Sequence, residues 1–235
     1  MKTSAVCHAL QAALEPLADP ARAEGMSAYM KGKFSYIGVP TPQRRAATLP
    51  VVRELKSAAS HELLALADAL WAMEEREYQY TAIDILARYS RSLSSKEVGH
   101  LLTVAQHKSW WDSVDGLAGT VGDILRRQLA ADRKVQTVMD KALEHPDFWV
   151  RRIAMIHQLG WREDTDVDRL FRYAKRLAHE KEFFIRKAIG WALRDYAWHD
   201  AERIAAFLAE AKDQLSPLSY REAGKNLARL QSLAG

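Results

Sequence analysis

The chain of 235 residues contains one cysteine, Cys7, and no long hydrophobic run. A single cysteine cannot form an internal disulfide, and no second cysteine completes the spacing of a metal site. The first residues form a short amphipathic stretch without the apolar run of a signal peptide or a membrane span. We therefore expect a cytoplasmic protein that makes no membrane contact and uses neither redox nor zinc chemistry.

The motifs of several enzyme classes are also missing. The eight histidines lack metal-ligand spacing, and no glycine pattern of a phosphate-binding loop is present. Ser109 and Ser113 have no evident histidine partner, which argues against nucleophilic hydrolysis. No segment rich in proline, glycine or serine divides the chain. We expect one domain over residues 1–235, a monomer, and neither a cofactor nor a metal.

The charge balance is only mildly basic. Lysine and arginine number 34 against 30 acidic residues, which gives a formal net charge of +4. This balance permits an acidic partner without demanding one. Because no basic tail is present, a surface for nucleic acid would have to be assembled by the fold.

Apolar residues recur at helical spacing along nearly the whole chain, and convincing alternating strands are absent. Asp19-Pro20, Thr41-Pro42 and Ser216-Pro217 each combine an N-cap residue with a proline at the first helical position. The sequence therefore predicts an all-α fold. The expected helices cover residues 4–17, 20–29, 41–58, 59–73, 75–92, 95–107, 109–130, 132–144, 147–160, 163–179, 181–198, 200–213 and 217 onward.

Similar residues recur at a nearly fixed interval. Phe148-Trp-Val-Arg-Arg152 and Phe183-Phe-Ile-Arg-Lys187 match at an offset of 35 residues. Five residues at early helix positions continue the series at spacings of 33, 38, 35 and 34 residues: Tyr78, Trp111, Trp149, Phe184 and Leu218. Such a period indicates helix pairs, here about six, that stack into a curved solenoid with their second helices along one surface.

The stretch Lys108-Ser-Trp-Trp-Asp-Ser-Val-Asp115 places two tryptophans beside two carboxylates. Ser109, with Asp112 three residues later, forms a capping-box pattern, so we expect the helix to begin at Ser109. Trp111 and Asp115 are four residues apart and share a helix face. For an isolated pair of this kind, a packing tryptophan and a surface acid are the commoner outcome.

The repeat series changes that balance. Counted from the five repeated residues, these positions share one helix face: Asp115 at +4, Arg152, Lys187 and Arg221 at +3, and Trp191 at +7. A carboxylate flanked by two tryptophans would stabilise a developing positive charge. Cleavage of a glycosidic bond has that requirement, because its transition state resembles an oxocarbenium ion. One carboxylate suffices when the leaving group is already cationic.

Arg152 has two interpretations. Its guanidinium could pair with Glu144, Asp147 or Asp115, or it could contact a phosphate, for which its planar fork is well shaped. Other basic residues could extend a stripe that binds the nucleic-acid backbone, although each alone is more often a solvated charge: Arg151, Arg186, Lys187, Arg194, Arg221 and Lys225.

Gly190, directly before Trp191, lies inside an expected helix, where glycine is unfavourable. Core packing is the commoner explanation, and the close approach of a ligand or another backbone is the alternative. The remaining tryptophans are expected in the core or at helix contacts: Trp71, Trp110, Trp149, Trp161 and Trp198.

The motifs resemble a known family. Residues 108–115, 183–197 and 218–223 look like signature segments of the AlkD-type DNA alkylation repair glycosylases, and residues 30–45 and 75–79 are similar to them too. The resemblance covers almost the whole chain. It implies HEAT-like repeats that hold duplex DNA in a concave face. It also implies base excision repair, by hydrolysis of the N-glycosidic bond of positively charged purines such as 3-methyladenine and 7-methylguanine.

The resemblance also implies roles for residues. Trp111, Asp115 and Trp191 would form the catalytic group around the deoxyribose of the lesion, with Arg152 contacting DNA beside it. Tyr29 matches another DNA-facing aromatic residue. The further DNA contacts that we expect are Lys187, Arg194, Arg151 and Arg221. The family acts without a base-binding pocket, and the lack of a lysine in a clear Schiff-base position indicates a monofunctional enzyme that leaves an abasic site on nucleoid DNA.

Two features depart from the family pattern: the loop Gly38-Val39-Pro40, and the glycines Gly116 and Gly119, which could loosen the catalytic helix. Two other classes stay open, a non-catalytic HEAT-like module that binds nucleic acid and a protein-binding scaffold. Asp115 discriminates between the classes, because a phosphate-binding surface gains nothing from a carboxylate at its centre.

Overall fold

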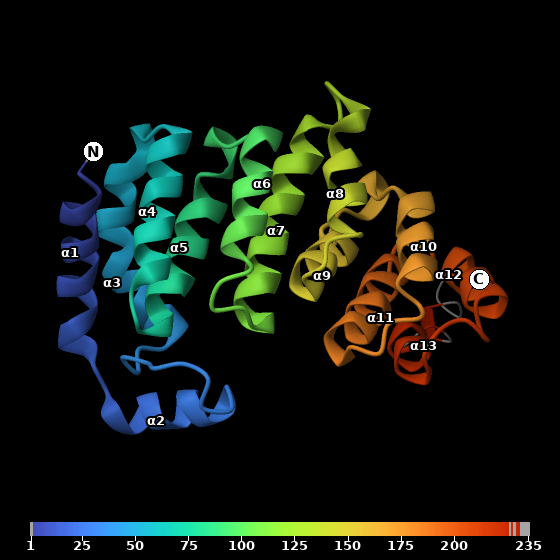
Figure 1. The fold of residues 1–235 in the computed structure, drawn as a ribbon, viewed down its shortest axis with the longest axis horizontal. Coiled ribbons are helices and arrows are strands. Elements are labelled where there is room, and N and C mark those ends of the chain that lie inside the picture. The colour runs from blue at the N-terminus through green and yellow to red at the C-terminus, as the bar shows by residue number, and fades with distance from the viewer. Residues whose placement is uncertain (1, 226, 228, 231–235) are drawn as a thin grey trace. The chain divides into compact units, whose positions relative to one another are not determined.

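The structure, a computed structural model, describes residues 2–225, 227, 229 and 230 (Figure 1). All regular elements in these residues are helices, which confirms the all-α prediction. The α-helices are α1 Thr3–Leu14, α2 Pro20–Tyr29, α3 Thr41–Arg53, α4 Ser60–Ala72, α5 Arg76–Arg88, α6 Ser95–Val104, α7 Trp111–Gln128, α8 Thr137–Ala142, α9 Phe148–Ile156, α10 Val167–Arg176, α11 Phe183–Ala197, α12 Ala201–Glu210 and α13 Pro217–Gly224. Short 3-10 turns are η1 Glu15–Leu17, η2 Glu54–Ser57, η3 Ser90–Ser92, η4 Arg133–Gln136 and η5 Arg162–Asp164.

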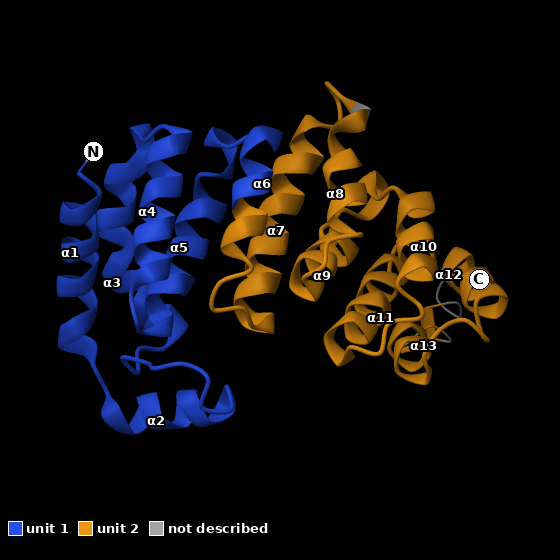
Figure 2. Cartoon of the chain, in the orientation of Figure 1, with its two compact units in different colours: residues 1–100 blue, residues 101–235 orange. Residues whose placement is uncertain are grey.

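Contacts within the chain divide it into two compact units, Met1–His100 and Leu101–Gly235 (Figure 2). Each unit has its own apolar core, centred on leucines such as Leu63 and Leu66 in the first and on Ile153 and Ile189 in the second. The prediction of one domain over residues 1–235 stays a prediction, as does the curvature of the solenoid.

In the first unit, α1, α3, α4 and α5 pack together, and α2 runs crosswise to them in Figure 1. Asp19 caps α2 as predicted, with its side chain accepting a hydrogen bond from the Arg22 amide. The loop that follows α2 is fixed by Glu77, a buried carboxylate that accepts hydrogen bonds from three consecutive backbone amides of residues 37–39. Gly38 has a φ of +94°, and a Cβ there would lie 2.1 Å from the Asp19 carbonyl oxygen. Its conformation and its crowding both require glycine.

In the second unit, the odd-numbered helices α7, α9, α11 and α13 pack against one another in chain order. Each carries its member of the repeat series in its first turn: Trp111, Trp149, Phe184 and Leu218. Tyr78 has the same place at the start of α5. This placement confirms the prediction that the repeat marks the second helices of successive pairs. The side chains at +3, +4 and +7 of these helices are therefore brought to neighbouring positions.

Two helix contacts in this unit depend on glycine. A Cβ at Gly122 would lie 2.1 Å from the His157 carbonyl oxygen, and one at Gly190 would lie 2.3 Å from the Cβ of Glu222. Neither distance is tolerable, so each glycine lets a neighbouring helix approach closely. Close approach of another backbone, one of the two explanations for Gly190, is the one that the structure shows.

Three local predictions were wrong. α7 begins at Trp111 after an extended Trp110, and the Ser109 hydroxyl donates instead to the Ala105 carbonyl, so Ser109 extends the end of α6 and does not cap α7. α3 likewise begins at Thr41, with Pro40 in the N-cap position and no side-chain cap. Trp198, which follows the last residue of α11, is 61% exposed.

α7 runs unbroken through Gly116 and Gly119. No helix in the described residues is both long and apolar enough to cross a membrane. In the same residues, no group of three or more histidine, cysteine or acidic side chains is arranged to hold a metal ion.

Candidate active site

Asp115, on the second turn of α7, forms a two-pronged ion pair with Arg152 of α9. Arg152 Nε donates to Asp115 Oδ1 at 2.7 Å, and Nη2 donates to Oδ2 at 2.8 Å. The remaining terminal nitrogen of Arg152 donates to the Phe184 carbonyl at the start of α11. The Arg152 side chain is 1% exposed, whereas that of Asp115 is 22% exposed. The pair therefore presents a carboxylate to solvent and keeps the cation behind it.

An aromatic wall stands beside this pair. The Arg152 guanidinium carbon lies 5.4 Å from the centre of the Trp191 ring, and Lys187 Nζ lies 5.6 Å from it. Both distances are in the range of cation–π contacts. Trp111 is half-buried and lies on the face of α7 that carries Asp115, one turn earlier. Three successive repeats thus bring Asp115, Arg152 and Trp191 together, as the +3, +4 and +7 positions predicted.

Burial governs the electrostatics of Asp115. It raises the pKa of the Asp115 carboxyl above its ordinary value, and the nearby Asp112 adds to the rise. The Arg152 guanidinium opposes this rise by hydrogen bonding and by its charge. The result is a carboxylate that is poorly solvated and held by one cation, which is a favourable environment for a further positive charge.

An aromatic cluster supports the backbone under the pair. The rings of Trp110, Trp149 and Phe184 are mutually in contact, with centroid separations of 4.8 to 5.9 Å. The cluster joins the first turns of α9 and α11 to the residue before α7. Trp110 and Trp149 are therefore helix-contact residues, as predicted.

Glu222 of α13 is a residue that sequence reasoning missed. Its carboxylate is almost fully buried and forms ion pairs with Lys187 at 3.1 Å, Lys225 at 2.6 Å and Arg194 at 2.6 Å. These three cations lower the pKa of Glu222 to about 2. A signal for it did exist, because Glu222 is at +4 from Leu218, as Asp115 is from Trp111.

Three other expected DNA contacts take no part in these ion pairs. Arg151 is half-buried, pairs with Glu180 at 2.8 Å and donates to the carbonyls of His145 and Pro146. Arg221 is exposed on α13. Tyr29, at the end of α2, is 73% exposed and belongs to the other unit. The ion pairs of Glu222 therefore join Lys187 and Arg194 to the site. Arg151, Arg221 and Tyr29 are not part of these contacts.

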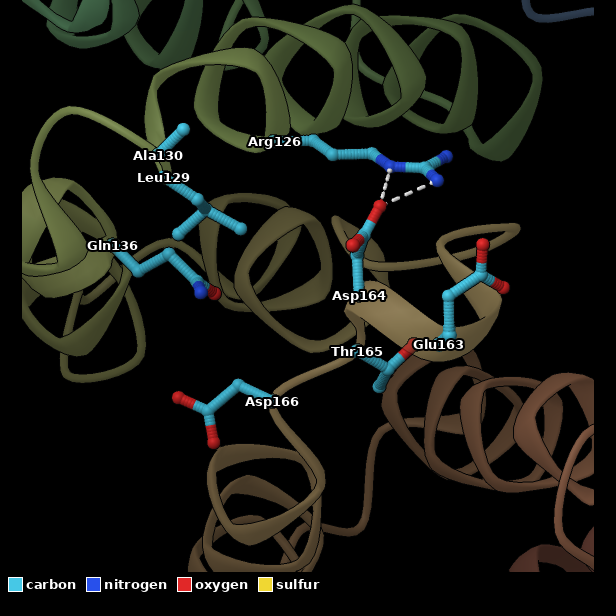
Figure 3. A pocket seen from close by; sticks show the side chains of 8 residues that line it. All are labelled: Arg126, Leu129, Ala130, Gln136, Glu163, Asp164, Thr165 and Asp166. Atoms are coloured by element: carbon cyan, nitrogen blue, oxygen red, sulfur yellow. Dashed lines mark hydrogen bonds and ion pairs between the residues drawn. The ribbon is translucent and has the colours of Figure 1, made fainter.

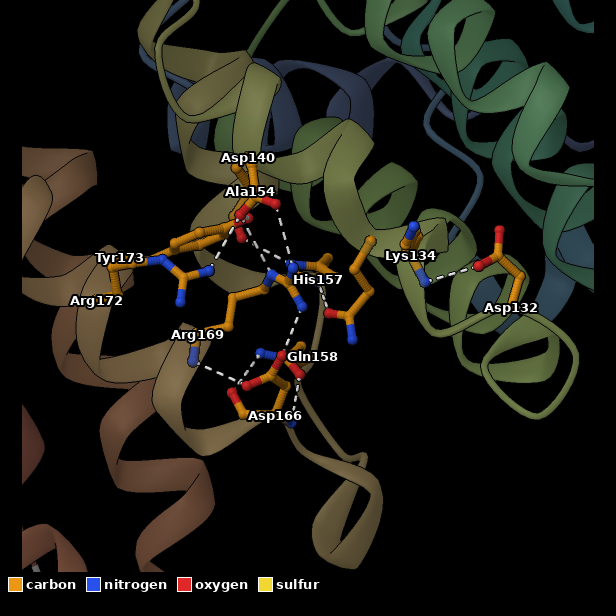
Figure 4. A network of polar contacts seen from close by, with 11 residues as sticks. Asp132, Lys134, Asp140, Ala154, His157, Gln158, Asp166, Arg169, Arg172 and Tyr173 are labelled. Carbon is orange, nitrogen blue, oxygen red and sulfur yellow. Dashed lines mark hydrogen bonds and ion pairs between the residues drawn. The ribbon is translucent and has the colours of Figure 1, made fainter.

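A second arginine–carboxylate pair in the same unit is more exposed than the first, because the side chains of Arg169 and Asp140 are 10% and 38% exposed (Figure 4). Arg169 donates to both oxygens of Asp140, at 3.3 and 3.2 Å, and Asp140 also accepts from Tyr173 and Arg172. His157 lies in the same network, fully buried, with its ring nitrogens on Ala154 and Gln136. Burial lowers the pKa of His157 to about 4.

A hollow in this unit lies away from Asp115 (Figure 3). It has a volume of about 800 Å³ and is lined by residues that include Arg126, Gln136 and Asp164. Arg126 is already paired with Asp164 at 2.6 Å. Asp115 and Arg126 are eleven residues apart on α7, or about 16 Å along the helix axis. The hollow is therefore a separate feature from the Asp115 site.

Comparison with known proteins identifies the family of this chain. The family model described as "DNA alkylation repair enzyme" matches residues 10–227. A solved structure, described as a predicted DNA alkylation repair enzyme from Enterococcus faecalis, is 34% identical with a TM-score of 0.84. The match covers 90% of this chain and 97% of that one. The chain belongs to the DNA alkylation repair enzyme family.

No protein with a curated function matches the chain significantly. The resemblance to DNA alkylation repair proteins, inferred from residues 108–115, 183–197 and 218–223, is nevertheless confirmed by family membership. Membership also supports an enzyme's role and DNA as the substrate. Within this DNA alkylation repair enzyme, the segments that carried the resemblance lie on α7, α11 and α13, where Asp115, Trp191 and Glu222 are found.

Proposed function

We propose that this DNA alkylation repair enzyme is a DNA glycosylase. It would hydrolyse the N-glycosidic bond of positively charged N-alkylated purines in duplex DNA, such as 3-methyladenine and 7-methylguanine, and leave an abasic site for base excision repair. The observation that carries the proposal is the Asp115 carboxylate, which is partly exposed and fixed from behind by the buried Arg152.

The geometry suits a reaction in which positive charge develops on a sugar. A preorganised carboxylate stabilises an oxocarbenium-like transition state without having to reorient during the reaction. The Trp191 ring, next to Arg152, would add a polarisable face, and Trp111 would add another. A cationic purine is already a good leaving group, so no general acid is needed.

Selectivity would then come from the chemistry of the leaving group. Asp115 has to reach only the deoxyribose, so we propose that the lesion is handled without a base-binding pocket. This differs from glycosylases that flip a base into a closed site. Unmodified purines, which are neutral, should react poorly. Tolerance of different alkyl groups follows from the same argument.

Water is the proposed nucleophile. Lys187, the lysine beside Trp191, is engaged in an ion pair with Glu222, and an amine held as a cation does not attack the sugar to form a Schiff base. The enzyme would therefore be monofunctional. Asp115 would stabilise the sugar cation and orient the water that attacks it.

Basic residues near the site would hold the DNA backbone. We propose Lys187 and Arg194, which share a face of α11 with Trp191, as phosphate contacts, together with Arg221, Arg151 and Tyr29 on other elements. Arg152 is buried against Asp115, so its first role would be to hold that carboxylate, and a DNA contact by Arg152 stays a prediction. Phosphate contacts of this kind make binding strongly salt-dependent.

Release of bases from methylated DNA tests the proposal. Purified protein is incubated with N-methylated duplex, and the released bases are identified by mass spectrometry against a protein-free control that corrects for spontaneous depurination. We expect 3-methyladenine and 7-methylguanine to be released and the DNA strand to stay uncut until the abasic sites are cleaved chemically. Tight DNA binding with no released base would favour the non-catalytic binding module instead.

A further inference from the structure

Glu222 lies where α13 approaches α11 most closely. The Cβ that Gly190 lacks would lie 2.3 Å from Glu222 Cβ and 3.0 Å from the Ser219 carbonyl oxygen. The Ser219 hydroxyl donates to the Arg186 carbonyl at 2.9 Å, which fixes the first turn of α13 on α11. The stem of Glu222 therefore has a fixed position directly beside the residue that precedes Trp191.

From that position the carboxylate pairs with cations that lie before and after Trp191 on α11. Its Oε1 pairs with Lys187 and its Oε2 with Arg194. Lys187 precedes Trp191 by four residues and Arg194 follows it by three, so all three side chains share one face of α11. A single buried carboxylate thus holds the cations on both sides of the indole along the helix.

The Trp191 ring lies between two ion pairs, Glu222–Lys187 and Arg152–Asp115. Glu222 holds Lys187, and Lys187 Nζ lies 5.6 Å from the centre of the Trp191 ring. Arg152 lies 5.4 Å from the same ring and holds Asp115. Displacing Lys187 would therefore disturb the position of the ring that stands next to the Asp115–Arg152 pair.

A simple electrostatic role does not explain this arrangement. Three cations surround one carboxylate, which leaves a local charge of +2 that a plain interhelical salt bridge would not need. If Glu222 only weakened the attraction for DNA, its removal would tighten binding and leave the reaction rate unchanged or higher. If it only joined α11 to α13, its removal would lower stability alone.

We propose that Glu222 is a positioning residue, which holds Lys187 so that the Trp191 ring is fixed at the Asp115 site. This inference rests on the proposed glycosylase function for its kinetic consequence, but not for its structural one. Because Glu222 acts through Lys187, it touches neither the substrate nor the reacting atoms.

Glu222→Gln tests the proposal, since it keeps the size of the side chain and removes its charge. In single-turnover release of 7-methylguanine, we expect the rate at saturating protein to fall about tenfold or more, as small displacements in an active site commonly cause. The dissociation constant for the same duplex should be unchanged or lower, because the local positive charge increases. A rate equal to wild type, with tighter binding or with reduced stability alone, would overturn the proposal.

Ser219→Ala is the matched structural control. It removes a buried hydrogen bond between the same two helices without changing the charge on Lys187. We expect it to lower the melting temperature and leave the rate of the folded protein unchanged. Glu222→Gln in a Lys187→Met background should slow release no further, because the effect passes through Lys187. Full, additive losses in the double variant would contradict that route.

A spectroscopic measurement separates this proposal from the glycosylase proposal. The indole N–H resonances of 15N-labelled protein are recorded, and that of Trp191 is assigned with Trp191→Phe. Glu222→Gln should shift or split the Trp191 resonance, whereas Ser219→Ala should leave it in place. An unmoved resonance would refute the positioning role even if wild-type protein releases methylated bases. A moved resonance would support it even if the protein releases none.

Discussion

Two aspartates of the second unit, Asp115 and Asp140, each form an ion pair with an arginine, and they differ in their other hydrogen-bond donors. Asp140 receives hydrogen bonds from Arg169, Arg172 and Tyr173, which together lower its pKa. Among the described residues Arg152 alone donates to Asp115, and burial raises the pKa of Asp115. Asp140 is saturated with donors, and Asp115 is not.

We propose that this difference separates a structural carboxylate, Asp140, from a functional one, Asp115. A carboxylate with many donors has its charge satisfied within the fold and gains little from a ligand. A carboxylate that is poorly solvated and held by a single cation still attracts positive charge. An arginine–aspartate pair alone therefore does not indicate function. The ability of its carboxylate to accept a further positive charge is more informative.

Replacing the two arginines should show this asymmetry. Arg152→Leu leaves Asp115 without a donor, and we expect it to lower the free energy of unfolding by about 3 to 4 kcal/mol, as the loss of one partner of a buried pair does. Arg169→Leu leaves Asp140 with Tyr173 and Arg172, and should cost about 1.5 kcal/mol. Urea unfolding at neutral pH measures both. Arg169 also pairs with Asp166 at 2.5 Å, so the loss at Arg169 includes that second pair. A loss at Arg169 equal to that at Arg152 would contradict the predicted asymmetry.

Acidification should destabilise the Asp140 region through His157. The pKa of His157 is about 4, below the ordinary value, so the unfolded chain binds more protons between about pH 4 and 6.5. Stability from this group is therefore complete above pH 6.5 and is lost as the pH falls through that window, by about 3 kcal/mol in total. In His157→Gln, the free energy of unfolding should fall by about 3 kcal/mol less over the same pH window. An unchanged slope in urea unfolding from pH 7 to 4.5 would exclude His157 as its source.

The pH dependence of base release should report the opposite perturbation at Asp115. Because burial raises the pKa of Asp115, the ionised form is lost at a higher pH than for an ordinary aspartate. The rate should therefore decline on acidification above the pH at which an exposed aspartate titrates. Single-turnover rates measured across a range of pH, and corrected for spontaneous depurination, give the acidic limb of the pH–rate profile. A limb at or below the ordinary aspartate value would contradict the assignment of Asp115.

Much of the fold follows from local sequence signals. Apolar periodicity and caps such as Asp19 and Ser216 predicted the helices, because these signals act within a few residues. The 35-residue interval predicted the second helices of the pairs and thus the meeting of Asp115, Arg152 and Trp191. Ser109 misled because a serine before a helix can also bond back to the preceding one, as it does to Ala105.

The partners of charged side chains were harder to predict. Three carboxylates were open to Arg152, and the structure shows why one prevailed: Asp147 caps α9 through the Trp149 amide, and Glu144 pairs with Arg176. The choice depends on packing between helices, which local spacing does not encode. Glu222 was missed for the same reason, since its burial depends on the absence of a side chain at Gly190.

The most direct test compares Asp115→Asn with Asp140→Asn. Both replace a carboxylate by its neutral isostere beside an arginine, and the measurement is single-turnover release of 7-methylguanine from methylated duplex, with DNA binding and melting temperature recorded in parallel. We predict that Asp115→Asn binds DNA normally and loses at least about 100-fold in rate, the scale for removing a preorganised electrostatic group. Asp140→Asn should melt earlier and release base at the wild-type rate. Unchanged release by Asp115→Asn would contradict the account.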